Sequence, residues 1–141
     1  MRAVLDVNVL VSALISRTGA PARLVELWLA GELEVVVSEM LLAELERALA
    51  YPKVRERVAA SDAERFVLVL REVAELVSDP DEAPPISSSD PRDDYLLALA
   101  ARARAQLVSG DEHLLSLRDR APVTSPREFL ELLESPPSTT V

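Results

Sequence analysis

The sequence predicts an α/β protein in which a parallel β-sheet carries helices on both faces. Segments typical of strands alternate along the chain with segments typical of helices, which is the pattern of such folds. Val4, Leu5 and Val7 form an apolar run near the N-terminus, as a buried parallel strand would. Residues 33–37 are apolar and rich in valine, which predicts a second buried strand. A chain of 141 residues is most simply one domain with its own core.

The remaining elements follow from helix caps, helix stops and short apolar runs. Strands are predicted at residues 2–8, 33–37, 74–77, 107–109 and 122–124. Helices are predicted at residues 9–16, 21–31, 39–50, after Pro52, from a capping box at 61–64 through residue 73, at 90–105, at 111–117, and from a capping box at 125–128. The proline- and serine-rich segment 79–89 is expected to be a loop. The domain is expected to cover residues 1–134, and residues 135–141 are expected to be a disordered tail.

Composition limits the class of protein. The net charge is −9, with 24 acidic and 15 basic residues, which argues against a protein that coats nucleic-acid phosphates with a basic surface. There is no cysteine, so disulfides and thiolate chemistry are excluded. No apolar run is long enough for a membrane span, and no signal-peptide pattern is present. We therefore expect a cytoplasmic protein that has no membrane partner.

Asp6 is the first candidate for a functional side chain. It lies near the end of the first predicted strand, and ligands of open α/β sheets gather at the carboxyl ends of strands. A buried carboxylate destabilises the fold unless a cation or hydrogen bonds compensate it. Asn8 comes two residues later and is expected on the same side of the strand.

Glu44 is the second candidate, on the predicted helix 39–50. Leu41, Leu45, Ala48 and Leu49 follow the helical repeat and define its buried stripe. Glu44 lies at the edge of that stripe and is the acid of this helix that leans inward. The alternative is an edge glutamate whose carboxylate points to solvent.

Four further acids lie at the starts of later helices. Asp90 precedes Pro91 and fits the N-cap position, and Asp93 fits the third helical position, so helix capping accounts for both. Asp94 has no such role and tops an apolar face, so we favour it over Asp93 as the functional acid. Asp111 follows a predicted strand, and its alternative role is the N-cap of the next helix.

These acids can converge at one edge of a parallel sheet. Converging carboxylates repel one another and raise one another's pKa values, and a bound divalent cation relieves that repulsion. Ligands that are all oxygen suit Mg²⁺ or Mn²⁺, and such ions can activate water for attack on a phosphodiester.

Four segments together resemble the PIN domains, and most closely the VapC-like toxins of bacterial toxin–antitoxin pairs. They are residues 6–14 (DVNVLVSAL), Glu44, residues 90–100 (DPRDDYLLALA) and residues 107–111 (LVSGD). The resemblance implies a three-layer α/β/α fold with a central, mostly parallel sheet of four to five strands. It also implies an Mg²⁺- or Mn²⁺-dependent ribonuclease that hydrolyses RNA phosphodiester bonds. The four acids would be Asp6, Glu44, Asp94 and Asp111, as catalytic and metal-binding residues, supported by Asn8, Ser109 and Asp93.

The resemblance further implies an antitoxin protein that covers the site, and homodimers occur among such proteins. Two positions differ from the common pattern, since Val7 and Ser109 stand where threonine is frequent. The alternative function is a catalytically silent PIN-like module that binds a protein partner. Retention of all four acids favours the enzyme. A phosphatase or a receiver domain that needs a late lysine is disfavoured, because Lys53 is the only lysine.

Overall fold

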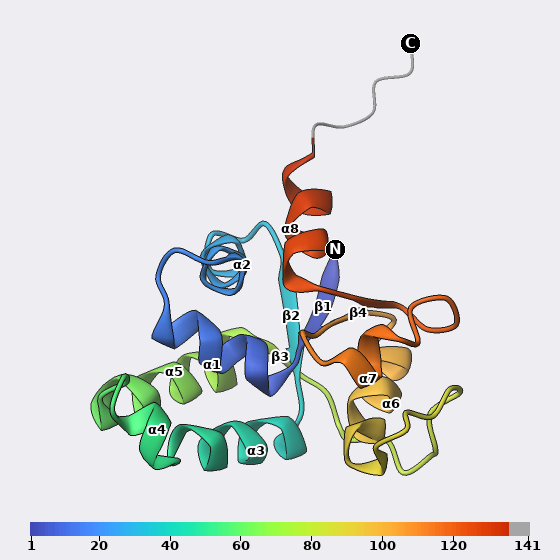
Figure 1. Ribbon diagram of the computed structural model, residues 1–141, viewed down its shortest axis with the longest axis horizontal. Coiled ribbons are helices and arrows are strands. Elements are labelled where there is room, and N and C mark those ends of the chain that lie inside the picture. The colour runs from blue at the N-terminus through green and yellow to red at the C-terminus, as the bar shows by residue number, and fades with distance from the viewer. Residues whose placement is uncertain (136–141) are drawn as a thin grey trace.

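The sheet has five parallel strands with helices on both faces, as predicted (Figure 1). The computed structural model describes residues 1–135, and the strand order is β3-β2-β1-β4-β5. The strands are β1 (Arg2–Leu5), β2 (Glu34–Val37), β3 (Glu75–Leu76), β4 (Gln106–Val108) and β5 (Val123–Thr124). Each pairs with its neighbour in parallel, and β1 is central, beside β2 on one side and β4 on the other.

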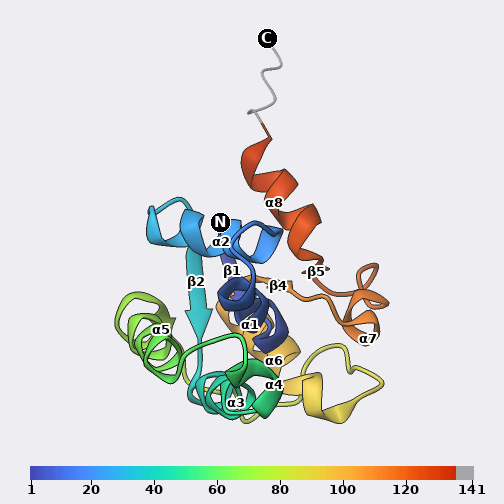
Figure 2. The ribbon, with the colours of Figure 1, turned by 60° about the vertical axis from the view of Figure 1, so that its left-hand side comes forward.

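The helices form the two outer layers of the fold. One layer holds α1 (Val7–Ile15), α2 (Ala20–Leu29), α3 (Glu39–Leu49), α4 (Pro52–Arg55) and α5 (Ala60–Val73). The opposite layer holds the short helix η1 (Pro91–Asp93), α6 (Asp94–Ala103) and α7 (Glu112–Leu115), and α6 packs against β1 and β4. The last helix, α8 (Pro126–Glu134), packs against α2. Figures 1 and 2 show α1, α2 and α5 on one side of the sheet and α6 on the other.

The order of the strands places a topological switch point beside β1, and we call the region outside the carboxyl ends of β1 and β4 the crevice. The chain first adds β2 and β3 on one side of β1, and then crosses to add β4 and β5 on the other. Right-handed connections put the helices of these two halves on opposite faces, so they part where β1 and β4 end. The sheet below is apolar, since Ala3, Val4 and Leu5 of β1 are at most 1% exposed. A rigid core therefore supports the crevice.

Several element boundaries differ from the predicted ones. Strand β1 ends at Leu5, and Asn8 lies in α1, so the prediction that Asp6 and Asn8 share one side of a strand is wrong. Helix α5 begins at Ala60 after the N-cap Ala59, so Ser61 does not open it. The predicted helix 90–105 begins with a 3₁₀ turn before α6. The capping box that opens α8 at Ser125 and Glu128 is confirmed.

Two predictions concern the ends and surroundings of the chain. Apart from Ser135, the predicted disordered tail lies outside the described residues. The domain boundary at residue 134 stays a prediction. Among residues 1–135, no helix combines the length and the apolar character that crossing a bilayer requires.

Candidate metal-binding active site

Asp6 lies at the junction between β1 and α1, buried at the mouth of the crevice. Its backbone carbonyl accepts bonds from the N–H groups of Val9 (2.9 Å) and Leu10 (3.1 Å), while its side chain makes no capping bond to α1. The side chain is 6% exposed, and its Oδ2 accepts a bond from the Ser109 hydroxyl at 2.7 Å. The backbone thus starts the helix and leaves the carboxylate available to the crevice.

The electrostatic surroundings of Asp6 disfavour its charged form. Burial raises the pKa of Asp6, and the neighbouring carboxylates of Asp111 and Glu44 add to the rise. The hydrogen bond from the Ser109 hydroxyl lowers the pKa, but the net direction is upward. The protein therefore holds a carboxylate where its charged form is disfavoured.

Ser109 and Asp111 follow β4, the strand beside β1. Ser109 is completely buried, and its Oγ both donates to Asp6 and accepts the backbone N–H of Asp111 at 3.0 Å. One oxygen of Asp111 accepts the N–H of His113 at 2.9 Å and caps α7. Asp111 therefore does act as the N-cap of α7, the alternative role given above. The same carboxylate also lies close to Asp6.

The structure brings Asp93 to these acids and turns Asp94 elsewhere. Burial raises the pKa of Asp93 to about 6, and the charges of Asp111 and Asp6 and a hydrogen bond with Asp111 contribute. The Oδ2 atom of Asp93 is buried, with no hydrogen-bond partner among the described residues. Asp94 instead accepts the backbone N–H of Ser88 at 2.8 Å, which holds the preceding loop.

Asp93 lies near the other acids in place of Asp94 because η1 is a 3₁₀ turn. Such a turn has about three residues per turn instead of 3.6, so it changes which side chain faces inward. Asp90 is the N-cap of that turn, and it also forms a two-point pair with the Arg92 guanidinium (3.1 and 2.9 Å). This pair holds the pKa of Asp90 below its usual range, so Asp90 is accounted for by local structure.

Glu44 reaches the site from α3 and is held by a residue of α6. The Tyr95 hydroxyl donates to Glu44 Oε2 at 2.6 Å, across 51 residues of sequence. Burial and this hydrogen bond raise the pKa of Tyr95 far above its usual range, so its hydroxyl stays protonated. This hydrogen bond argues against the alternative in which the Glu44 carboxylate only points to solvent. No rule of sequence spacing pairs Tyr95 with Glu44, because the two residues belong to different helices.

Asn8 and Asp79 complete the surroundings. Asn8 is exposed on the first turn of α1. Asp79 accepts the backbone N–H of Met40 at 3.0 Å, near the start of α3. Its charge also acts on Tyr95, so it lies near the same edge of the sheet. Nothing in the sequence pattern singled out Asp79, because the loop that carries it has no regular repeat.

The donor set suits a hard divalent cation. Four carboxylates offer oxygen ligands and act on one another electrostatically: Asp6, Glu44, Asp93 and Asp111. Within residues 1–135, none of the four forms an ion pair with arginine or lysine. Within the same residues, no group of three or more acidic or histidine side chains is arranged closely enough to hold a metal ion by itself. Mg²⁺ keeps several water ligands and usually takes one or two carboxylates, so a finished cage is not required.

The comparisons with known proteins agree with this architecture. The family model described as PIN domain matches residues 2–113. An uncharacterized protein of Methanocaldococcus jannaschii, MJ1680, is 25% identical over 144 residues, which cover 95% of this chain and 92% of that protein. The crystal structure of VapBC2 from Rickettsia felis, bound to a DNA fragment from their promoter, contains a chain of similar fold, with a TM-score of 0.59 and 17% identity. That match covers 89% of this chain and 98% of the other. Since the family model spans most of its length, the chain belongs to the PIN domain family.

Proposed function

We propose that this PIN domain is a metal-dependent endoribonuclease, and that it is the toxin of a toxin–antitoxin pair. The observation that carries the nuclease proposal is the carboxylate cluster at the carboxyl ends of β1 and β4. Asp6 and Asp93 both have raised pKa values, and the buried Asp93 Oδ2 has no partner among the described residues. Such a cluster destabilises the protein unless a cation binds to it.

The proposed ligands are Asp6, Glu44, Asp93 and Asp111. We include Asp93 in place of Asp94 because Asp93 is the acid that contacts Asp111. The chemistry that bound Mg²⁺ or Mn²⁺ supplies is activation of water and stabilisation of charge on phosphodiester oxygens. Ser109 orients Asp6 by its hydrogen bond, and Asp94 holds the loop before η1 through Ser88.

RNA as the substrate and an antitoxin as the partner rest on the resemblance to VapC-like toxins. The VapBC2 match supports them through the fold alone. The chain is acidic overall, so phosphate contacts would fall to individual arginines near the site. Arg92 is 87% exposed beside Asp90 and is the nearest candidate. A cytoplasmic location and a homodimer belong to the same proposal.

The test is cleavage of labelled single-stranded RNA by the purified protein, in Mn²⁺ and in EDTA. Asp6→Asn should abolish cleavage without lowering the unfolding temperature, because the change removes a buried charge whose ionised form the fold disfavours. Asp62→Asn, an exposed acid on α5, is the matched control and should cleave like the wild type. Single-stranded DNA of the same sequence tests whether RNA is preferred.

The outcomes separate the enzyme from a silent binding module. Cleavage that needs both Mn²⁺ and Asp6 would support the nuclease. A folded wild-type protein that neither cleaves nor binds Mn²⁺ would contradict it, and the protein-binding alternative would then lead.

A further inference from the structure

Two carboxylates of the site are each held by a short hydrogen bond from an uncharged hydroxyl. Ser109 donates to Asp6 at 2.7 Å, and Tyr95 donates to Glu44 at 2.6 Å. Ser109 stands at a position where a hydroxyl is expected from the family resemblance. Tyr95 has no assigned role, although its contact is the shorter of the two.

A hydroxyl is suited to this task because it orients a carboxylate without neutralising it. Elsewhere in the molecule arginine plays that part, as Arg92 does for Asp90 and Arg71 does for Glu39. A guanidinium bonded to Glu44 would cancel its charge and would repel an incoming cation. The charge of Glu44 does act on Arg92, but that guanidinium makes its hydrogen bonds to Asp90. The phenol fixes Oε2 of Glu44 and leaves the negative charge and the second oxygen available.

The bond also joins the two layers of the fold. Glu44 belongs to α3 and Tyr95 to the first turn of α6, which lie on opposite sides of the crevice. A glutamate at the edge of a buried stripe has several rotamers, and restricting them on ligand binding costs free energy. A donor that restricts them beforehand removes that cost from cation binding.

We propose that Tyr95 is a positioning residue that holds Glu44 in the orientation needed to bind the divalent cation. The proposal rests on the function proposed above, because it concerns the same acidic site. The aromatic ring of Tyr95 packs against the core, whereas its hydroxyl serves the carboxylate. The two parts of the side chain can therefore be tested separately.

The test is Mn²⁺ binding by isothermal titration calorimetry with Tyr95→Phe, which removes only the hydroxyl. The dissociation constant for Mn²⁺ should rise about three- to ten-fold, the change expected for loss of roughly one net hydrogen bond. Cleavage lost at low Mn²⁺ should return as Mn²⁺ is raised, so the defect lies in binding. Tyr51→Phe is the matched control, since Tyr51 is the only other tyrosine and is 63% exposed.

A double-mutant cycle with Glu44→Ala shows whether Tyr95 acts through Glu44. In the Glu44→Ala background, Tyr95→Phe should change Mn²⁺ affinity by less than about two-fold. If the two changes add, or if Tyr95→Phe binds Mn²⁺ as well as or more tightly than the wild type, the proposal is wrong. A lower unfolding temperature with unchanged Mn²⁺ affinity would likewise leave Tyr95 a structural residue only.

Two further outcomes are distinguishable from these. If the wild type binds no Mn²⁺, the proposed function is wrong and the role of Tyr95 is wrong with it. If Tyr95→Phe does not fold, Tyr95→Leu repeats the test, because it also lacks the hydroxyl and fills the site with a different apolar shape.

Discussion

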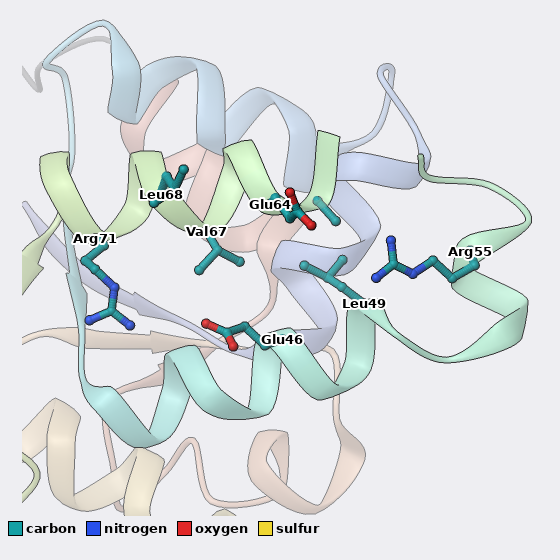
Figure 3. A pocket seen from close by; sticks show the side chains of 8 residues that line it. Glu46, Leu49, Arg55, Glu64, Val67, Leu68 and Arg71 are labelled. Atoms are coloured by element: carbon teal, nitrogen blue, oxygen red, sulfur yellow. The ribbon is translucent and has the colours of Figure 1, made fainter. Parts of the chain in front are cut away.

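The two sides of helix α3 carry acids that the protein treats in different ways. Toward α5, Glu39 forms an ion pair with Arg71 at 2.6 Å, and the charge of Glu46 also acts on Arg71. Figure 3 shows Glu46 and Arg71 pointing into the pocket between α3 and α5. Toward α6, Glu44 meets a tyrosine hydroxyl and other acids.

The difference indicates where a ligand is needed. On the α5 side, Glu39 and Glu46 are solvated and close to the Arg71 guanidinium, so their negative charges are already balanced. On the crevice side the acids face one another, and burial and mutual repulsion raise the pKa values of Asp6 and Asp93. Ion pairs on a protein surface contribute little to stability, whereas uncompensated buried carboxylates are costly. The two sides of α3 therefore differ: one carries solvated charge pairs, and the other carries acids that repel one another.

The largest difference in RNA cleavage is expected between variants of two neighbouring acids, one in η1 and one in α6. Asp93→Asn should reduce RNA cleavage by more than about 100-fold, beyond the loss typical of residues that only support a metal ligand. Asp94→Asn should reduce it by less than about 10-fold, because Asp94 holds the loop through Ser88. Steady-state cleavage at saturating Mn²⁺ measures both. The reverse order would restore Asp94 as the functional acid.

A smaller loss is expected from Ser109→Ala. This change removes the donor to Asp6 and leaves the Asp111 N–H without its acceptor in a buried position. Mn²⁺ affinity should fall about 10- to 100-fold, the range seen for residues that orient metal ligands. Calorimetric titration measures the affinity, and Ser12→Ala, an exposed serine on α1, is the control. Unchanged affinity would mean that Asp6 needs no orienting bond.

The raised pKa of Asp93 is expected to make the stability of the protein depend on pH. Its pKa is about 6 in the folded protein against an ordinary value of 3.8, so the folded state binds this proton more tightly. The stabilisation is fully present below pH 3.8 and is lost as the pH rises through about 6. In EDTA, the unfolding temperature of the wild type relative to Asp93→Asn should fall between pH 4.5 and 7.5. Two parallel curves would contradict the raised pKa.

The smallest effect is expected on the other side of α3. Arg71→Ala breaks the pair with Glu39, whose two side chains are 40% and 62% exposed. Urea unfolding should show little or no change in stability, as is usual for exposed ion pairs. RNA cleavage should not change. A large loss of cleavage would mean that the α5 side of α3 also serves the site, and the comparison of the two sides would fail.

Patterns that can be read along the sequence predict the framework of strands and helices. Alternating apolar strands and amphipathic helices predicted the parallel sheet with two helical layers, because burial depends on periodicities that can be read locally. The sequence also predicted that Asp6 near the end of one strand and Asp111 after another can converge at one edge of the sheet, and that Glu44 leans inward. These positions depend on strand ends and on one helix repeat.

The packing of the whole chain decides which of these side chains lie together at the edge of the sheet. A 3₁₀ turn after Asp90 brings Asp93 to Asp111 and leaves Asp94 to the loop, and no helical repeat could have predicted this. The bond between Tyr95 and Glu44 joins residues 51 positions apart, and it exists because α3 and α6 converge from opposite layers. Periodicity shows which face of an element is buried, but contacts between elements depend on how the whole chain packs.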